Sequence, residues 1–293
     1  MSATWWPLML VVSAALIHAT WNLLAKRAAD AGPTFVFVFT FVAMVVYLPW
    51  TLWLLFHGES FWGWEALLCI AISGFLHLIY NLCLQRGYQV ADFSVVYPVA
   101  RGSAPLMSSV GAFLLLGEQP SLYGVLGLVA VVVGIALIST QGNLASFKEP
   151  GAHKGVQWGG LTGMIIASYT LVDAFGVKAL LIHPVVLDWF SNSARLLFMA
   201  PWQWSARHKV RERMHGKWAL AIAVGMLSPL SYILVLLALQ MGAEVSFVAP
   251  AREMSMMVGA LLGMVVLREA VGVWRLAGCG VLIVGVLLLS SYN

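Results

Sequence analysis

The sequence contains little charge for its length. Only 10% of its 293 residues are Asp, Glu, Lys or Arg, whereas soluble domains carry about 25%. Hydrophobic residues make up 61% of the chain, and its mean hydropathy is +0.90. A soluble fold of this size could not hide so much apolar surface, because apolar atoms already form more than half of an ordinary folded surface. The composition therefore excludes an ordinary soluble protein and favours lipid as the solvent.

Reactive and metal-binding motifs are also missing. Cys69, Cys83 and Cys279 lie inside apolar runs and form no CxxC pair, so neither a zinc site nor a disulfide framework is predicted. The sequence has no HExxH, GxSxG or DDxxD motif and no Walker A motif. We therefore expect no enzymatic activity, no cofactor and no metal ion. The net charge of +4 comes from loop clusters, which indicates membrane topology and not nucleic-acid binding.

Long apolar runs are what the sequence does contain. A spanning helix needs about 20 mostly apolar residues, and breaks such as Gly32-Pro33 and His183-Pro184 have turn chemistry. No basic segment precedes Trp5, so the first run is predicted to be a retained helix and not a cleaved signal. The predicted spans are 6–25, 34–56, 64–84, 93–116, 121–140, 157–178, 184–204, 217–238, 244–267 and 271–291. The predicted fold is an all-α integral membrane protein with ten transmembrane helices.

An internal repeat relates the two halves at one offset of 151 residues, the separation of Pro33 and Pro184. The matched pairs include Trp53 with Trp204, Gly74 with Gly225, Arg101 with Arg252, Glu118 with Glu269, Gly127 with Gly278, and Gly134 with Gly285. Five helices per half is an odd number, so the second half must enter the membrane from the opposite side. We predict two inverted five-helix repeats, at 1–140 and 157–293, joined by a loop at 141–156. Such repeats usually hold a substrate site near the midplane and alternate access around it.

Basic residues are distributed unevenly between the loops. One side would hold Lys26, Arg27, Arg86, Lys148, Lys154, Arg207, Lys209, Arg211, Arg213, Lys217 and Arg268. The other side would hold little beyond Lys178. Because cytoplasmic loops carry the excess of Lys and Arg, we predict a multi-pass protein of the inner (plasma) membrane with both termini outside the cytoplasm.

Several short motifs resemble those of one family. They are His-Ala-Thr-Trp-Asn-Leu-Leu-Ala-Lys at 18–26, Tyr-Pro-Val-Ala-Arg-Gly at 97–102 and Ala-Pro-Ala-Arg-Glu at 249–253. With the repeat, they resemble the EamA-type ten-helix members of the drug/metabolite transporter superfamily. The resemblance implies alternating-access transport, often efflux, of amino acids, nucleotide precursors, sugars or other metabolites. The second half departs from the first at Arg268, which replaces Gly117, and at Pro250, which lies one position later than Pro98 predicts.

Arg101 and Arg252 are the leading candidates for a substrate site. Each lies well inside a predicted span, where an ionised group is costly unless it meets a partner or water. The inverted symmetry places them at similar depths, and a guanidinium group binds carboxylate or phosphate well. The alternative is that each is tied to a nearby acid, for which Glu253 is the obvious candidate.

A polar stripe in the span at 184–204 is a second candidate. Asp188, Asn192 and Arg195 have spacings that place them on one helical face. Their counterparts in the first half are apolar: Phe37, Phe41 and Met44. The scaffold therefore does not need polarity here, which favours a substrate role. The alternative is an Asp–Arg pair, bridged by Asn192, that fastens this helix to a neighbour.

Polar pairs four residues apart occur in four further spans. His18 and Asn22 match Tyr169 and Asp173, and His77 and Asn81 match Ser228 and Tyr232. From this set, Asn22 and Asp173 are candidate substrate ligands. His18, His77 and Glu253 are candidate proton carriers, because a histidine titrates near neutral pH. Tyr80, Tyr97 and Trp189 are candidate cavity aromatics. The alternative for each pair is ordinary hydrogen bonding between helices.

These observations together predict a secondary active transporter that exports a small organic metabolite. An amino acid, or another solute that bears a carboxylate or phosphate, would suit the arginines. A lipid-carrier flippase on the same scaffold is the main alternative, and an integral-membrane enzyme or a channel is less favoured. The expected partners are the small-molecule substrate and the lipid bilayer, with no nucleic acid. The sequence leaves the oligomeric state open, a monomer included.

Overall fold

A computed structural model describes residues 5–58, 63–205, 209–267 and 272–291, and every regular element in these ranges is a helix. The first half comprises α1 (Trp5–Lys26), α2 (Pro33–His57), α3 (Trp64–Val90), α4 (Phe93–Leu115) and α5 (Leu122–Thr140). The second half comprises α6 (Ala152–Lys178), α7 (Pro184–Ser205), α9 (Trp218–Gln240), α10 (Val245–Arg252), α11 (Met254–Leu267) and α12 (Val273–Ser290). Short turns of helix lie in the connections: η1 (Ala29–Ala31), η2 (Ala145–Lys148) and α8 (Val210–Arg213).

Local sequence explains where several helices begin. Pro33 and Pro184 are the first residues of α2 and α7, a position where proline costs no hydrogen bond and already has a helical φ. Ser121 caps α5, because its hydroxyl accepts the backbone N–H of Gly124 at 2.9 Å. The predicted spans agree closely with these helices, apart from two: α3 ends at Val90 and not at residue 84, and α6 begins at Ala152 and not at residue 157.

The span predicted at 244–267 is wrong in one respect, because it is broken. α10 ends at Arg252, and α11 begins at Met254, with Glu253 between them. Pro250 lies inside α10, where its missing backbone N–H and its ring weaken the turn that precedes it. Beside the break, Arg252 faces the cavity, whereas Glu253 pairs with Arg101 and is absent from the cavity lining.

The helices are apolar on their outer surfaces, as lipid contact requires. Among the described residues, eight helical runs are long and apolar enough to cross a membrane, with α10 and the start of α11 counted as one run. Large apolar side chains such as Phe56 and Leu114 are exposed, and in water such a surface would aggregate. The chain is therefore a multi-pass membrane protein. α4 and α7 have comparable lengths but lower hydropathy, because they carry Arg101 and the Asp188–Arg195 stripe.

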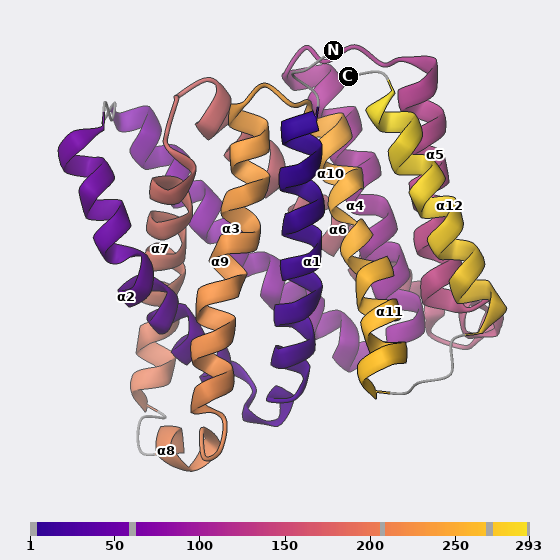
Figure 1. Cartoon of the computed structure of the whole chain (residues 1–293). Coiled ribbons are helices and arrows are strands. Elements are labelled where there is room, and N and C mark those ends of the chain that lie inside the picture. Colours follow the sequence, from indigo (N-terminus) through magenta and orange to yellow (C-terminus); the bar gives the residue numbers. More distant parts are fainter. Residues whose placement is uncertain (1–4, 59–62, 206–208, 268–271, 292–293) are drawn as a thin grey trace.

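The two halves run in opposite directions through the bundle. Both chain ends lie at one end of the molecule, which is the upper end in Figure 1. α1 starts at this end, and α6 starts at the opposite end. Equivalent glycines make equivalent contacts across the halves. A Cβ atom on Gly74 of α3 would lie 2.8 Å from the Cβ of Ala194 on α7, and one on Gly225 of α9 would lie 2.7 Å from the carbonyl oxygen of Phe39 on α2.

α5 and α12 form the closest seam between the halves. A Cβ atom on Gly127 would lie 2.7 Å from the carbonyl oxygen of Gly285, and one on Gly285 would lie 2.8 Å from that of Gly127. Gly134 and Gly278 repeat this contact at 2.9 Å in both directions. Any side chain at these positions would collide with backbone, so the seam depends on glycine.

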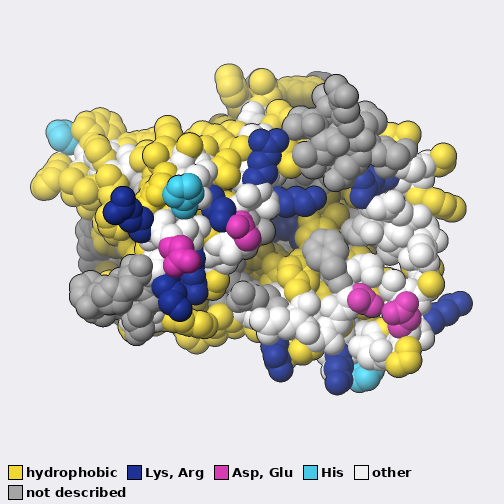
Figure 2. Space-filling view, turned by 90° about the horizontal axis from the view of Figure 1, so that it is seen from below, with side chains coloured by type: hydrophobic (Ala, Val, Ile, Leu, Met, Phe, Trp, Pro, Cys, Tyr) yellow, Lys and Arg dark blue, Asp and Glu magenta, His cyan; other side chains and the backbone are white. Residues whose placement is uncertain are grey.

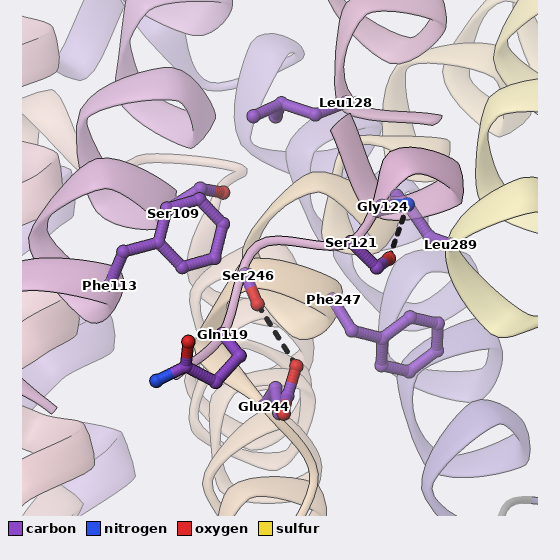
Figure 3. A pocket seen from close by; sticks show the side chains of 10 residues that line it. All are labelled: Ser109, Phe113, Gln119, Ser121, Gly124, Leu128, Glu244, Ser246, Phe247 and Leu289. Carbon is purple, nitrogen blue, oxygen red and sulfur yellow. Dashed lines mark hydrogen bonds between the residues drawn. The ribbon is translucent and has the colours of Figure 1, made fainter. Parts of the chain in front are cut away.

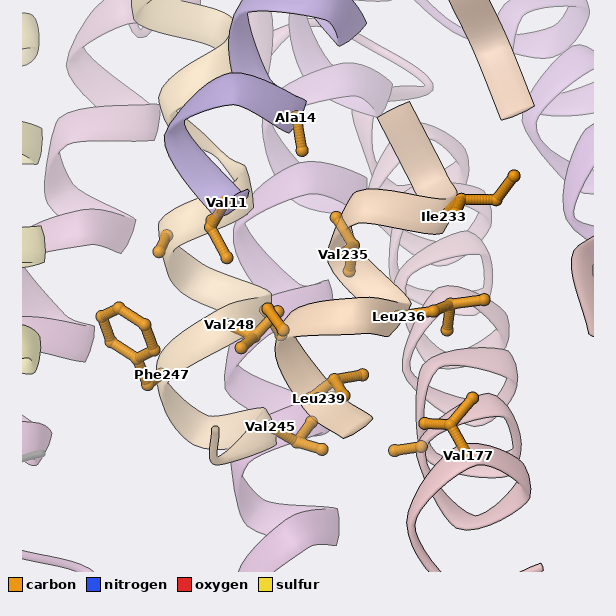
Figure 4. Packing of buried hydrophobic residues seen from close by; sticks show 14 of the residues in the cluster. Val11, Ala14, Val177, Ile233, Val235, Leu236, Leu239, Val245, Phe247 and Val248 are labelled. Atoms are coloured by element: carbon orange, nitrogen blue, oxygen red, sulfur yellow. The ribbon is translucent and has the colours of Figure 1, made fainter. Parts of the chain in front are cut away.

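A dry apolar core fills the end of the bundle nearest the chain termini, and Figure 4 shows part of it. Val11 of α1, Val177 of α6 and Leu239 of α9 are buried there against Val248 of α10. We call this region the closed end and the opposite end the open end.

Glu118 ties the two halves together at the closed end. From the loop after α4, its carboxylate accepts the backbone N–H groups of Val245 and Ser246, at 2.6 and 2.9 Å, and the hydroxyl of Ser246, at 2.7 Å. Lys178 lies 3.6 Å from the same carboxylate. Glu118 therefore caps the N-terminus of α10, where the helix dipole favours a negative charge. Its repeat counterpart, Glu269, lies outside the described residues, as do Arg207 and Arg268.

A small polar pocket adjoins this cap, and Figure 3 shows its lining side chains. Glu244 lies there next to Ser246, whose hydroxyl donates to it at 3.3 Å. Burial, and then the neighbouring Glu118 carboxylate, raise the pKa of Glu244 above its usual value.

Candidate functional site

A large cavity lies between the two halves. Its volume is about 1040 Å³, and both repeats contribute to its lining. Its floor is the closed-end core, since Ala14 and Val235 belong to both. Its mouth is at the open end, where Lys26 ends α1 and Arg275 lies in the first turn of α12. Figure 2 looks onto this end and shows a depression among Lys and Arg side chains. The cavity therefore opens at the open end, and the apolar core blocks it at the closed end.

Arg101 and Arg252 both line this cavity, but their environments differ. Arg101 Nη2 lies 2.8 Å from Glu253 Oε2 and donates to the Ser255 hydroxyl at 3.4 Å. Glu253 is only 1% exposed and is absent from the cavity lining. Glu253, a candidate proton carrier in the sequence, is therefore the ion-pair partner of Arg101 and does not line the cavity.

Arg252 has no such partner. It is 6% exposed and faces the cavity, yet it makes no hydrogen bond or ion pair with any side chain in the described part of the chain. Tyr169, the Glu253 carboxylate and Tyr232 lie within its electrostatic range, although Glu253 is paired with Arg101. A buried guanidinium that is not hydrogen-bonded to an anion is costly, so this group is available to a ligand.

Asp173 is the centre of a second cluster. Its Oδ2 accepts a short hydrogen bond from the Tyr232 hydroxyl and lies 3.2 Å from His77 Nε2. The His77 ring stacks on Tyr169 with ring centroids 4.0 Å apart, and Tyr80 meets Tyr169 edge-on at 6.0 Å. The cluster joins α6 to α3 and α9.

The polar stripe of α7 is internally bonded as well as accessible. Asn192 Nδ2 donates to Asp188 Oδ2 at 2.9 Å, and Asn192 Oδ1 accepts from Arg195 at 2.8 Å. Arg195 also donates to the Thr40 hydroxyl of α2 at 3.0 Å. Asn192 therefore bridges Asp188 and Arg195, and the stripe fastens α7 to α2 while all three residues line the cavity.

The structure brings most of the other candidates to the same place. Asn22 donates to the backbone carbonyl group of His18 at 2.7 Å, and His18 meets Trp21 edge-on at 4.9 Å. His18, Asn22 and Tyr97 line the cavity.

Trp189 is the exception among the aromatic candidates, because it is not part of the lining. Its Nε1 donates to the carbonyl oxygen of Met44 on α2 at 2.9 Å. This tryptophan therefore holds α7 against α2 and does not form a wall of the cavity.

Two charged residues of the mouth were absent from the sequence-based set of candidates. Lys26 was assigned to a loop, and Arg275 was hidden inside the last apolar run. The sequence could have identified both residues, because each lies within one turn of a helix end on the basic side.

Apolar helices around a polar, charge-lined cavity define a class, namely multi-pass membrane proteins that can hold a polar solute inside the bilayer. Within that class the chain belongs to the EamA-like transporter family, whose model matches it twice, over residues 5–140 and 153–291. It is therefore a membrane transporter by family. No curated protein matches the sequence.

The fold also resembles solved structures, of which 29 chains match. One crystal structure superposes with a TM-score of 0.72 over 96% of this chain and 95% of that one, at 16% identity. At this identity the similarity supports the fold alone.

Proposed function

We propose that this protein is a secondary active transporter that exports a small organic anion, such as an amino acid or another carboxylate- or phosphate-bearing metabolite. The observation that carries the proposal is Arg252, a buried guanidinium that faces the cavity without a partner. Its planar fork suits a carboxylate or phosphate group, to which it can donate two parallel hydrogen bonds. A small anion bound there would remove the cost of the unpaired charge.

The dimensions of the cavity agree with such a ligand. Small-molecule sites usually occupy about 300–1,000 Å³, and this cavity of about 1040 Å³ is at the upper limit. Asp188 also lines it, so a substrate with an amino group as well as a carboxylate would find both charges matched. This balance favours a zwitterion over a plain cation.

Alternating access follows from the closed end, the open end and the inverted halves. In the proposed cycle all ten long helical runs cross the membrane, α4 and α7 included, because their polar residues face the cavity. The basic open end lies in the cytoplasm by the distribution of Lys and Arg, so the structure represents a cytoplasm-facing state. Both termini then lie outside the cytoplasm. A reporter that is active only outside the cytoplasm, inserted between α7 and α9, should be inactive; activity there would reverse the orientation.

The direct test is a thermal-shift screen of purified protein against amino acids, organic acids, nucleotides and sugar phosphates. A ligand that binds only the folded state stabilises it by about 2.7 kcal/mol at 100 times its Kd. We expect one chemical class to raise the melting temperature of the wild type and of Arg86→Gln, an exposed arginine at the open end. The same class should give no shift with Arg252→Gln.

The Arg252→Gln variant should itself melt no lower than the wild type, because the charge it removes has no partner. A ligand whose shift survives in this variant would refute the anion site. A shift with a polyprenyl phosphate alone would replace the solute carrier by the lipid-carrier flippase.

A further inference from the structure

Asp173 lies at a junction of both halves of the protein. It belongs to α6, and its carboxylate contacts His77 of α3 and Tyr232 of α9. Asp173 is one of the residues that line the cavity, yet its side chain is only 1% exposed. An isolated carboxylate at such a depth is expensive, and such groups are functional candidates by default.

The two carboxylate oxygens of Asp173 have different environments. Oδ2 accepts from Tyr232 and lies 3.2 Å from His77 Nε2. Oδ1 is buried and has no hydrogen-bond partner among the described residues. An ammonium group or a metal ion would need open space beside Oδ1, whereas a proton needs none. The unpaired oxygen therefore selects a proton as its ligand.

His77 supplies the route between this carboxylate and water. Its side chain is 19% exposed and lines the cavity, while its Nε2 faces Asp173. Stacking on Tyr169 fixes the plane of the ring. A histidine held in this way can take a proton from cavity water at one ring nitrogen and pass one to the carboxylate from the other.

The symmetry of the chain shows that the fold does not require this cluster. In the repeat, Asp173 corresponds to Asn22, His77 to Ser228 and Tyr232 to Asn81. These three mirror residues are neutral, although Tyr169, on which His77 stacks, corresponds to His18. The scaffold therefore does not need a carboxylate at this position.

The cluster is surrounded by titratable and charged groups from each neighbouring helix. They are Cys69 on α3, Tyr169 on α6 itself, Asp188 on α7, Tyr232 on α9, and, within range of Tyr169, Tyr80 on α3, Arg101 on α4, Arg252 on α10 and Glu253 after it. Asp188 is the competing carboxylate. It differs because Asn192 donates to it and because it sits in a bonded stripe with Arg195.

We propose that Asp173, with His77 as its relay, is the proton-binding site that couples transport to the proton gradient. This inference rests on the proposed transport function. When the cavity faces outward, a proton passes through His77 to the carboxylate and neutralises it. When the cavity faces the cytoplasm, the proton leaves by the same route, so each turn of the carrier can move one proton inward.

The site can be tested without a known substrate. Infrared difference spectra of the reconstituted protein between alkaline and acidic pH contain a carboxylic-acid C=O band from every carboxylate that takes a proton. Subtracting the Asp173→Asn spectrum from the wild-type spectrum should leave one such band, and that band should also be present in Asp188→Asn. The wild-type residue at the mirror position is Asn22, so an asparagine at position 173 should be tolerated, and a melting curve checks that it is. Wild-type and Asp173→Asn spectra that do not differ in this region would overturn the proposal.

The coupling can be tested in proteoliposomes with a radiolabelled mixture of amino acids and organic acids. In the wild type an imposed pH gradient should drive accumulation of label. In Asp173→Asn accumulation should fall to the level of protein-free vesicles, while exchange of internal for external label continues. Loss of exchange as well, or accumulation that survives, would overturn the proton role. If the wild type neither exchanges nor accumulates the label, the transport proposal fails for these solutes, and the infrared result still decides whether Asp173 binds a proton.

Discussion

Removing the carboxylate of Glu118 should loosen the closed end by an amount that the structure allows us to work out. The side chain accepts two backbone N–H groups at the start of α10 and the hydroxyl of Ser246. Replacing a helix cap by Ala costs about 0.5–2 kcal/mol, and a hydrogen bond to a charged group contributes about 1.5–3 kcal/mol. Because the three bonds share one carboxylate, their energies do not add fully. We therefore expect Glu118→Ala to cost about 2–4 kcal/mol.

The measurement is unfolding in mixed detergent micelles with increasing dodecyl sulfate, followed by circular dichroism. Glu118→Gln keeps one acceptor oxygen and should lose roughly half as much stability as Glu118→Ala. Glu149→Ala removes an exposed carboxylate from the loop before α6 and serves as the matched control. If Glu118→Ala is no less stable than Glu149→Ala, the cap does not hold the closed end and the reasoning fails.

Two further predictions concern helix packing. Gly278→Ala should lower the melting temperature, because its Cβ would lie 2.8 Å from Ile138 and overpacking costs about 1–3 kcal/mol. The control is Gly280→Ala, two residues further along α12, where a Cβ would enter open space. This variant should be neutral or slightly stabilising. Equal effects of the two would contradict the seam. Trp189→Phe should cost roughly 1 kcal/mol through its lost bond to Met44 and should leave ligand shifts unchanged. A weakened ligand shift would return Trp189 to the binding site.

Hydropathy and turn chemistry predicted the helices well because both are local properties. Pro33 and Pro184 start helices wherever the rest of the chain lies, and the repeat places Arg101 and Arg252 at equivalent positions. The position of Pro250 already indicated an irregularity, but sequence could not show that the helix breaks at Glu253.

The partners of the site residues could not be predicted, because they depend on contacts between helices. Arg101 and Arg252 are equivalent in sequence, yet only Arg101 is paired with Glu253. The repeat predicted that His77 and Asp173 each face inward, but their mutual contact depends on how α3 packs against α6. Trp189 has the spacing of a cavity residue and instead bonds to α2.

The reciprocal glycine contacts of α5 and α12 have the form of an isologous interface. In such an interface residue i of one copy touches residue j of the other, and j touches i. Gly127 is equivalent to Gly278, and Gly134 to Gly285, so the contacts of Gly127 with Gly285 and of Gly134 with Gly278 follow that rule within one chain. The seam is the one that two identical five-helix subunits would form as an antiparallel homodimer. Fusion into one polypeptide leaves that geometry intact and frees each copy to diverge, as Asp173 and Asn22 have done.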